Sequence, residues 1–387
     1  MGMLAESIIN SALRESQTSP EVAERIERDE EMDGELRRIL ESRKAEIKVV
    51  GVGGAGGNTI SRLMQVGIVG AETLGINTDA QDLLYTDADR KILIGKDLTG
   101  GLGAGADPNI GTEAAKESKE EIKKALEGAD MVFIACGLGG GTGTGASHVI
   151  ADISKKVGAL TVGIVTMPFA MEGRQRGKNA QEGLENLESV VDTLIVIPND
   201  KLLEIVPDVS ILTAFKVADE ILVNAVKGIA ELITKPGLVN LDFADVRAVM
   251  GSGGLAMIGM GESDSENRAI ESVEKSLNNP LLDVNIEGAT GALINVSGGE
   301  DVTIRECQEI VEAVNTKISP DAKIIWGAQI DKALGESVRT MLIVTGVKSS
   351  QIYGPEHTYT QQKQKEIEKV LGIDFVGSFG GAAGRKK

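Results

Sequence analysis

The sequence is poor in the residues that build disulfide frameworks and zinc sites. Its 387 residues include two cysteines, Cys136 and Cys307, and two histidines, His148 and His357. The cysteines are solitary and far apart, and the histidines form no HExxH motif. These absences argue against a disulfide framework, structural zinc and Ser-His-Asp catalysis, and they fit a reducing compartment. We expect no metal ion held by protein side chains.

Aromatic residues and positive charges are also scarce. Phe, Trp and Tyr make up 3% of the chain, and 40 Lys and Arg stand against 58 Asp and Glu, a formal net charge of −18. A nucleic-acid-binding surface needs clustered cations and gains affinity from stacking aromatics. We therefore expect no nucleic-acid partner. Hydrophobic residues at 42% nevertheless exclude a largely disordered chain.

No segment has the composition of a secretory signal or a membrane span. The N-terminal residues lack a basic stretch followed by an apolar one, which predicts that no signal peptide is present. The uncharged run over residues 131–151 contains six glycines, so we interpret it as a buried strand leading into a Gly-rich loop. We expect a cytoplasmic protein that does not insert directly into the membrane.

From Ile47 onward, apolar runs alternate with amphipathic helical stretches. Near-continuous apolar strands separated by helices predict a parallel sheet that is covered on both faces. A long helix is expected over residues 209–233, because Lys235-Pro236-Gly237 is a strong stop signal. Asp107-Pro108 predicts the start of another helix. The expected strands cover residues 47–52, 73–77, 91–95, 131–136, 160–166 and 193–198.

Four segments are predicted along the chain. They are a charged helical extension (1–46), an α/β nucleotide unit with the long helix (47–237), a smaller α+β unit (238–348) and a polar, Gly-rich tail (349–387). In the smaller unit we expect strands over 289–296, 323–330 and 340–347, and helices over 263–277 and 303–318. The extension fits either a loosely packed helix or a partner-binding arm. In the tail, residues 372–376 fit either an adaptor-docking segment or a strand that packs back on the body.

Three glycine-rich loops each follow an expected strand and precede an expected helix. They cover residues 51–57, 100–105 and 139–145, in a chain with 48 glycines. Glycine lets backbone N–H groups approach an anion, and a following helix N-terminus adds a favourable dipole. In open α/β sheets, ligands bind beyond the carboxyl ends of the strands. The loops therefore predict a site for a phosphate chain.

The loops alone leave several ligands open. Gly51, Gly53 and Gly56 match the G-x-G-x-x-G pattern of dinucleotide-binding proteins, so a structural turn, an NAD-dependent oxidoreductase and another nucleotide-binding protein all remain. The loop over 139–145, with its two threonines, favours a nucleoside phosphate. No G-x-x-x-x-G-K-[S/T] or N-K-x-D motif occurs, so this is not a P-loop NTPase.

Seven motifs together resemble the tubulin/FtsZ family of GTPases. They are more similar to FtsZ than to tubulin, and more similar to archaeal than to bacterial forms. They occur in the family's order between residues 47 and 346: GVGGAGGN (51–58), NTDAQ (77–81), GLGAGADP (101–108), GGGTGTG (139–145), MPFAMEGRQR (167–176), IPNDKL (197–202) and NLDFADVR (240–247). The resemblance implies an α/β fold, with a Rossmann-like parallel-sheet GTPase domain joined by a long central helix to a smaller α+β domain.

The resemblance also implies a function. It implies GTP/GDP and Mg²⁺ as cofactors, a head-to-tail homopolymer, and a role in cell division at mid-cell, with a membrane adaptor bound through the tail. A non-hydrolysing or cell-shape scaffold is the alternative within the family. The GTP-binding residues that it implies are Gly53, Gly54, Asn58, Asn77, Gly101, Gly103, Gly140, Gly141, Thr142, Gly143, Thr144, Glu172, Arg176, Asn199, Phe215 and Asp219.

Several of these residues have plainer interpretations. Glu172 and Arg176 are also spaced as a surface i,i+4 ion pair. Phe215 would otherwise be a core residue, and Asp219 a solvated helix residue. Thr142 and Thr144 would otherwise cap the helix that follows their loop.

The resemblance places catalysis on Asp242 and Asp245, which would act on the GTP of the neighbouring subunit. They are three residues apart where a helix is expected to begin, so both can lie on one face. As a plain N-cap and a first-turn acid they would serve the helix itself. The two interpretations are compatible. In the family this loop lies at the opposite end of the subunit from the nucleotide.

Overall fold

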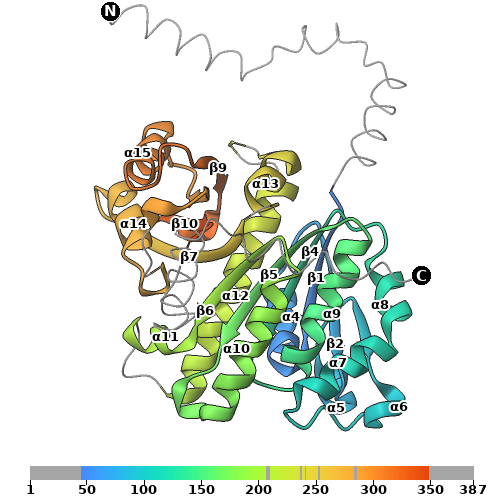
Figure 1. Ribbon diagram of the computed structural model, residues 1–387. Helices are drawn as coiled ribbons and strands as arrows, with labels where there is room; N and C mark the ends of the chain where they lie inside the picture. The colour runs from blue at the N-terminus through green and yellow to red at the C-terminus, as the bar shows by residue number, and fades with distance from the viewer. Residues whose placement is uncertain are drawn as a thin grey trace, which may run out of the picture. The chain divides into compact units, whose positions relative to one another are not determined.

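The computed structural model describes residues 45–205, 210–235, 238–239, 241–251, 253–282 and 286–347 (Figure 1). Most of the predicted N-terminal extension and all of the predicted tail, including its apolar segment 372–376, lie outside these residues. Among the described residues, no helix is long and apolar enough to cross a bilayer.

Six parallel strands form one part of a ten-stranded sheet, in the order β3-β2-β1-β4-β5-β6. This is the order of the doubly wound nucleotide-binding fold, as the alternation of strands and helices predicted. β1 is buried along its whole length, which is why its sequence reads as a continuous apolar run. The strands are β1 (Ile47–Val52), β2 (Ala71–Asn77), β3 (Arg90–Leu93), β4 (Met131–Gly137), β5 (Leu160–Met167) and β6 (Thr193–Pro198).

Helices cover both faces of these strands. Val49 of β1 packs in the core that contains α4 and α12, and its neighbour Val50 packs in the core beneath α7, α8, α9 and α10. Alternate residues of one strand thus serve two hydrophobic layers. The helices of this part are α4 (Gly53–Val66), α5 (Ala80–Tyr85), α6 (Lys96–Thr99), α7 (Pro108–Glu117), α8 (Lys119–Leu126), α9 (Thr142–Lys156), α10 (Arg174–Glu188), α11 (Asn199–Ile205) and α12 (Ile211–Thr234), with the 3-10 helix η1 (Ala170–Glu172).

Helix starts agree with the local sequence. Asp107 caps α7, as predicted, because its carboxylate accepts a hydrogen bond from the Asn109 N–H at 2.9 Å. The long helix α12 begins after Ser210, whose hydroxyl accepts from the Thr213 N–H at 3.2 Å. It ends at Thr234. Its predicted stop residues, Pro236 and Gly237, lie outside the described residues.

The remaining four strands continue the same sheet in the order β7-β10-β8-β9. β7 runs parallel to β6 over three residue pairs, β10 is antiparallel to β7 and β8, and β8 is parallel to β9. This mixed part, with its helices, has the α+β character that was expected of the smaller unit. Its elements are α13 (Phe243–Met250), β7 (Gly254–Ser263), α14 (Arg268–Leu277), η2 (Pro280–Leu282), η3 (Ile286–Gly288), β8 (Gly291–Gly298), α15 (Ile304–Asn315), β9 (Lys323–Ile330), η4 (Lys332–Leu334) and β10 (Val338–Thr345).

Strand β7 was not predicted, and the helix expected over 263–277 begins only at Arg268. Ser263 is the last residue of β7. Glycines hide this strand in the sequence, because α14 packs directly on its backbone. A Cβ at Gly259 would lie 2.2 Å from the Ser276 carbonyl oxygen, and one at Gly261 would lie 2.1 Å from that of Ser272. These glycines therefore mark close helix–sheet packing, not a loop.

Candidate functional site

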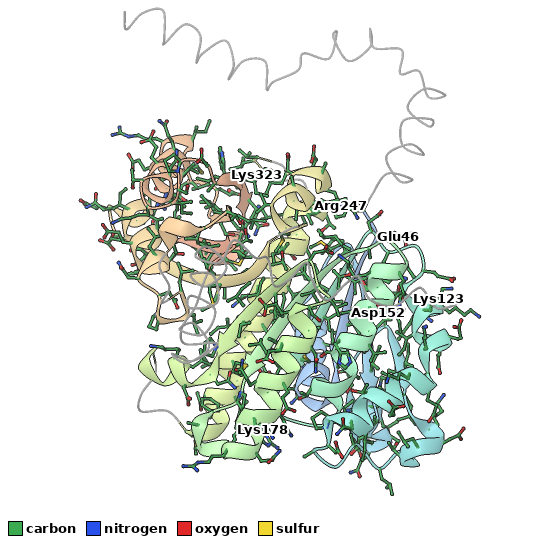
Figure 2. The ribbon with its side chains drawn as sticks, in the orientation of Figure 1. Glu46, Lys123, Asp152, Lys178, Arg247 and Lys323 are labelled. Carbon is green, nitrogen blue, oxygen red and sulfur yellow. The ribbon has the colours of Figure 1, made fainter. Side chains whose placement is uncertain are left out.

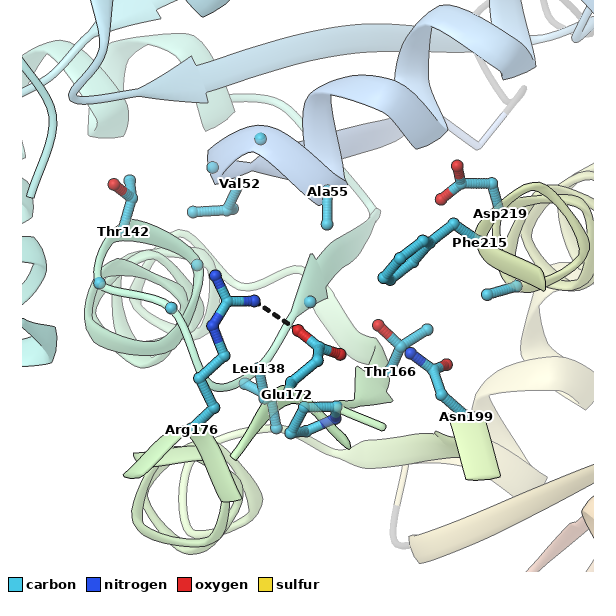
Figure 3. A pocket seen from close by; sticks show the side chains of 18 residues that line it. Val52, Ala55, Leu138, Thr142, Thr166, Glu172, Arg176, Asn199, Phe215 and Asp219 are labelled. Atoms are coloured by element: carbon cyan, nitrogen blue, oxygen red, sulfur yellow. Dashed lines mark hydrogen bonds and ion pairs between the residues drawn. The ribbon is translucent and has the colours of Figure 1, made fainter. Parts of the chain in front are cut away.

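A pocket of about 290 Å³ opens beyond the carboxyl ends of β1, β4, β5 and β6, where the glycine loops predicted a site (Figure 3). Eleven of its lining residues are among the sixteen that the sequence resemblance implied. These are Gly53, Gly54, Gly140, Gly141, Thr142, Gly143, Glu172, Arg176, Asn199, Phe215 and Asp219. The others, which sequence reasoning did not name, are Val52, Ala55, Gly137, Leu138, Thr166, Pro168 and Ala218. Several of these residues lie at or just after the carboxyl end of a strand. The tendency of ligands to bind beyond these ends in open α/β sheets could therefore have predicted them.

Two helices point their N-termini into this pocket. α4 begins at Gly53 and α9 at Thr142, and neither has an acidic residue in its first turn or a side chain capping it. The free N–H groups and the positive ends of both helix dipoles therefore favour an anion between them. A Cβ on Gly140 would meet nothing within 4 Å, so the backbone there is open to a ligand. This arrangement fits a phosphate chain.

The first glycine loop serves packing as well as the pocket. A Cβ at Gly51 would lie 2.3 Å from the Gly56 carbonyl oxygen, and one at Gly56 would lie 2.5 Å from that of Ala135. Gly53 has φ +70° and lies against the Gly143 backbone nitrogen, 2.9 Å from where its Cβ would be. Gly51 and Gly56 thus allow α4 to pack closely on the sheet. Gly53 brings together the loops of residues 51–57 and 139–145, which we call the phosphate cradle.

Five of the implied residues do not line the pocket. Thr144 is buried, and its hydroxyl accepts from the Gly139 N–H at 2.9 Å, so it closes the loop that it belongs to. Asn77 donates to the Asp82 carboxylate at 2.6 Å and accepts from the Thr78 N–H. The other three, Asn58, Gly101 and Gly103, do not line the pocket either.

The loop that contains Gly101 and Gly103 lies beside the cradle. Both glycines have positive φ, at +79° and +87°, and the Gly103 N–H donates to the Thr78 carbonyl. Thr78 in turn shares a hydroxyl–hydroxyl bond of 2.7 Å with Thr142 of the pocket. This loop is therefore tied to the cradle through Thr78.

Glu172 and Arg176 form the predicted i,i+4 ion pair and also line the pocket (Figure 3). Glu172 accepts a hydrogen bond from the Phe169 N–H at 2.9 Å, which fixes the turn that leads to α10. The ion-pair interpretation is thus confirmed, and the assignment of both residues to nucleotide binding stays a prediction. The pair presents one carboxylate and one guanidinium at the pocket wall.

Three side chains define the far end of the pocket. Phe215 is 40% exposed, and its ring meets Phe169 edge-on with centroids 5.3 Å apart. Asn199 is 5% exposed, and its Oδ1 has no hydrogen-bond partner among the residues that the structure describes. Burial, reinforced by the neighbouring Glu220, raises the pKa of Asp219 to about 6.

This end fits guanine. An aromatic face, a carboxylate and the buried amide oxygen of Asn199 together suit a planar ligand that donates several hydrogen bonds along one edge. Guanine has such an edge in its N1–H and N2–H₂ groups. The buried acceptor of Asn199 would otherwise be left without a donor, which is costly.

Asp242 and Asp245 lie away from this pocket. Asp242 caps α13 and accepts from the Asp245 N–H at 2.8 Å, and both residues are exposed. On the same helix, Arg247 donates to the carbonyl of Gly158, which lies just before β5 begins. Figure 2 shows Arg247 at the same end of the molecule as Glu46, which precedes β1. The two acids therefore lie at the end where the parallel strands start, opposite the pocket.

Two protein-family models match this chain. Residues 46–207 match the model of the Tubulin/FtsZ family, GTPase domain, and residues 254–348 match that of the FtsZ family, C-terminal domain. The chain belongs to the tubulin/FtsZ family. Membership makes it a GTPase, and the NAD-dependent oxidoreductase suggested by the G-x-G-x-x-G pattern is set aside.

Curated relatives match most of this chain. Cell division protein FtsZ 1 of Thermococcus kodakarensis is 61% identical over 343 residues, which cover 88% of this chain and 92% of that protein. The protein of the same name from Methanocaldococcus jannaschii is 62% identical over 344 residues, covering 89% and 93%.

Solved structures share the fold. A structure described as an empty FtsZ dimer from M. jannaschii matches with a TM-score of 0.79 and 62% identity, over 85% of this chain and 93% of that one. CetZ2 from Haloferax volcanii, at 21% identity and a TM-score of 0.69, covers 84% of this chain and 99% of its own, and it shares the fold alone.

The raised pKa of Asp219 predicts how GTP binding depends on pH. In the predicted binding mode guanine donates to the ionised carboxylate, so the protonated form, which predominates below about pH 6, must lose its proton on binding. GTP affinity should therefore fall about tenfold per pH unit below about pH 5.5 and be flat above about pH 7. Calorimetry near pH 6 in buffers of different ionisation enthalpy should show proton release. Asp219→Asn is the control, because it removes this titration and leaves that of the phosphates.

Proposed function

We propose that this chain is a cell-division protein that binds GTP, assembles head to tail into filaments and hydrolyses GTP where two subunits meet. One observation carries the proposal. The nucleotide pocket and the exposed pair Asp242 and Asp245 lie at opposite ends of the same parallel strands. A heterologous contact between identical subunits brings such opposite ends together. The names of its FtsZ relatives support the role in cell division.

The pocket residues bind and orient the nucleotide. The N-termini of α4 and α9, with Gly140 and Gly141, hold the phosphates, while Asp219 and Asn199 accept from the guanine edge. Mg²⁺, when bound with the nucleotide, would neutralise phosphate charge. Among the described residues no cluster of three or more Asp, Glu, His or Cys could hold a metal ion, so we infer that the phosphates would be its principal ligands.

The carboxylates that act on the attacking water would come from the next subunit. Asp242 uses Oδ1 to accept from the Asp245 N–H, and among the described residues no hydrogen bond or ion pair occupies its Oδ2 or the Asp245 carboxylate. Held at one helix start, the two groups can orient a water molecule and accept its proton. A non-hydrolysing scaffold would not need this exposed pair.

The remaining parts of the proposal rest on the sequence. We infer a cytoplasmic protein that acts at the division site, with the tail segment 372–376 docking a membrane adaptor. These tail residues lie outside those that the structure describes.

The dependence of GTPase activity on protein concentration tests the shared site. Because neither end can hydrolyse GTP alone, activity per molecule should be near zero below a critical concentration and rise above it. Steady-state phosphate release over a dilution series measures this, with sedimentation to detect the polymer. Activity per molecule that is independent of concentration would mean that one subunit holds a complete site.

A further inference from the structure

One face of α10 forms a platform under the loop of residues 139–145, which we call the signature loop. A Cβ at Gly139 would lie 3.0 Å from the Arg176 carbonyl oxygen, and one at Gly183 would lie 2.3 Å from Cγ2 of Thr144. Arg176, Asn179 and Gly183 are three and four residues apart, so they share this face. The loop therefore cannot shift relative to α10 without disturbing backbone packing.

Asn179 extends from this platform to a second loop. It is 6% exposed, and its Nδ2 donates to the Ala106 carbonyl at 3.2 Å and, more weakly, to the Gly139 carbonyl at 3.5 Å. Its Oδ1 accepts from Nε2 of Gln175 at 2.9 Å, which sets the orientation of the amide. One buried side chain thus joins residues 73 and 40 positions away along the chain.

Ala106 is held in a conformation that alanine avoids. Its φ is +62°, and no other described residue apart from glycines has a positive φ. The left-handed region places Cβ against the following backbone, so an alanine remains there only when its surroundings hold it. The adjacent part of this loop packs on the cradle: a Cβ at Gly141 would lie 2.8 Å from Cβ of Ala104 and 3.0 Å from the Asp107 nitrogen.

We propose that Asn179 is a positioning residue of the nucleotide site. Its amide holds Ala106 in the left-handed conformation and thereby fixes the loop of residues 100–107 against Gly141 in the phosphate cradle. Nothing in the sequence motifs singles out this asparagine. The inference rests on the proposed assignment of the pocket to GTP, because Asn179 would act on the nucleotide only through these two loops.

A double-mutant cycle between Asn179 and Ala106 tests the proposal. Asn179→Ala removes the donor, and the affinity for a fluorescent GTP analogue should fall about fivefold, the effect of one lost hydrogen bond. Ala106→Gly alone should bind within about twofold of the parent, because glycine adopts positive φ freely. In the Ala106→Gly background, Asn179→Ala should cost less than about twofold, since no strained residue remains to be held.

Matched variants separate positioning from stability. Asn186→Ala, an exposed asparagine on the same helix, should leave affinity unchanged. Gln175→Ala is a milder change that only frees the Asn179 amide, so it tests the proposal even if Asn179→Ala folds poorly. It should weaken binding by about twofold. Thermal midpoints without nucleotide accompany each affinity.

Three results would overturn the proposal. They are an unchanged affinity in both Asn179→Ala and Gln175→Ala, an equal loss with and without Ala106→Gly, and an equal loss in Asn186→Ala. The underlying pocket assignment is checked separately by Asp219→Ala. If that variant still binds GTP with full affinity, the pocket assignment fails, whatever the cycle shows.

Discussion

Replacing Asp245 by Ala is expected to lower GTP hydrolysis by the assembled protein by at least about 100-fold, the usual contribution of a positioned general base. The dissociation constant for GTP should stay within about twofold of the parent value, because Asp245 is far from the pocket of its own subunit. Phosphate release above the critical concentration gives the hydrolysis rate, and equilibrium binding below it gives the dissociation constant for GTP. Asp321→Ala, an exposed acid elsewhere on the described surface, is the matched control and should behave as the parent does.

Mixing two inactive variants tests whether the site is shared. Asp219→Ala damages the pocket and keeps α13, whereas Asp245→Ala keeps the pocket and damages α13. In an equimolar copolymer, about one quarter of the head-to-tail contacts combine an intact pocket with an intact α13. The mixture should therefore regain activity that neither variant has alone. If Asp245→Ala stays fully active, the assignment of this residue is wrong.

Arg268→Ala should have the largest effect on stability, lowering the free energy of unfolding by about 3 kcal/mol. The Arg268 side chain is 12% exposed, and its guanidinium binds the Glu306 carboxylate at 2.6 Å and that of Asp301 at 2.7 Å. It also donates to the Glu336 carbonyl at 2.5 Å. The substitution would leave the half-buried Glu306 without its cation. It would also remove the contacts that link the start of α14 to Asp301 and to the Glu336 carbonyl.

Urea denaturation followed by circular dichroism measures this loss. Arg305→Ala is the control, because Arg305 is 87% exposed and pairs with Glu309 across one helical turn. Exposed pairs of this kind contribute little, so the control should lose less than about 0.5 kcal/mol. A loss below about 1 kcal/mol in Arg268→Ala would show that the three contacts do not act as one structural unit.

The bounds of strands could be predicted from the sequence where burial on both faces makes the strand apolar throughout. β1 and β6 have the bounds that were predicted, because a parallel strand under two helical layers admits almost no polar residue. β7 could not be read in this way. Its glycines are required by the backbone of α14, and a pattern of single residues does not show which helix will pack there.

The candidate site was readable at its phosphate end and much less so at its base end. Glycine-rich loops that precede helices predict anion binding from their composition and position alone. Phe215 and Asp219 lie on α12, whose pattern predicts one core and one solvated residue, so only the family resemblance pointed to them. Thr144 and Asn77 show the converse. Their types suit a ligand, but their hydrogen bonds serve the neighbouring backbone and side chains.

The narrow junction between the two parts of the sheet has a mechanical consequence. In a filament of the proposed kind, tension would enter each subunit at the pocket and leave it through α13. Strands β6 and β7 meet over three residue pairs, from Thr193 with Gly254 to Ile195 with Ala256. Within the sheet, load passing from one part to the other must cross these pairs, and beside the sheet it can run along α12 or through the contact of Arg247 with the Gly158 carbonyl. The stiffness of the subunit under tension therefore depends on a short strand contact and on the helices packed beside it.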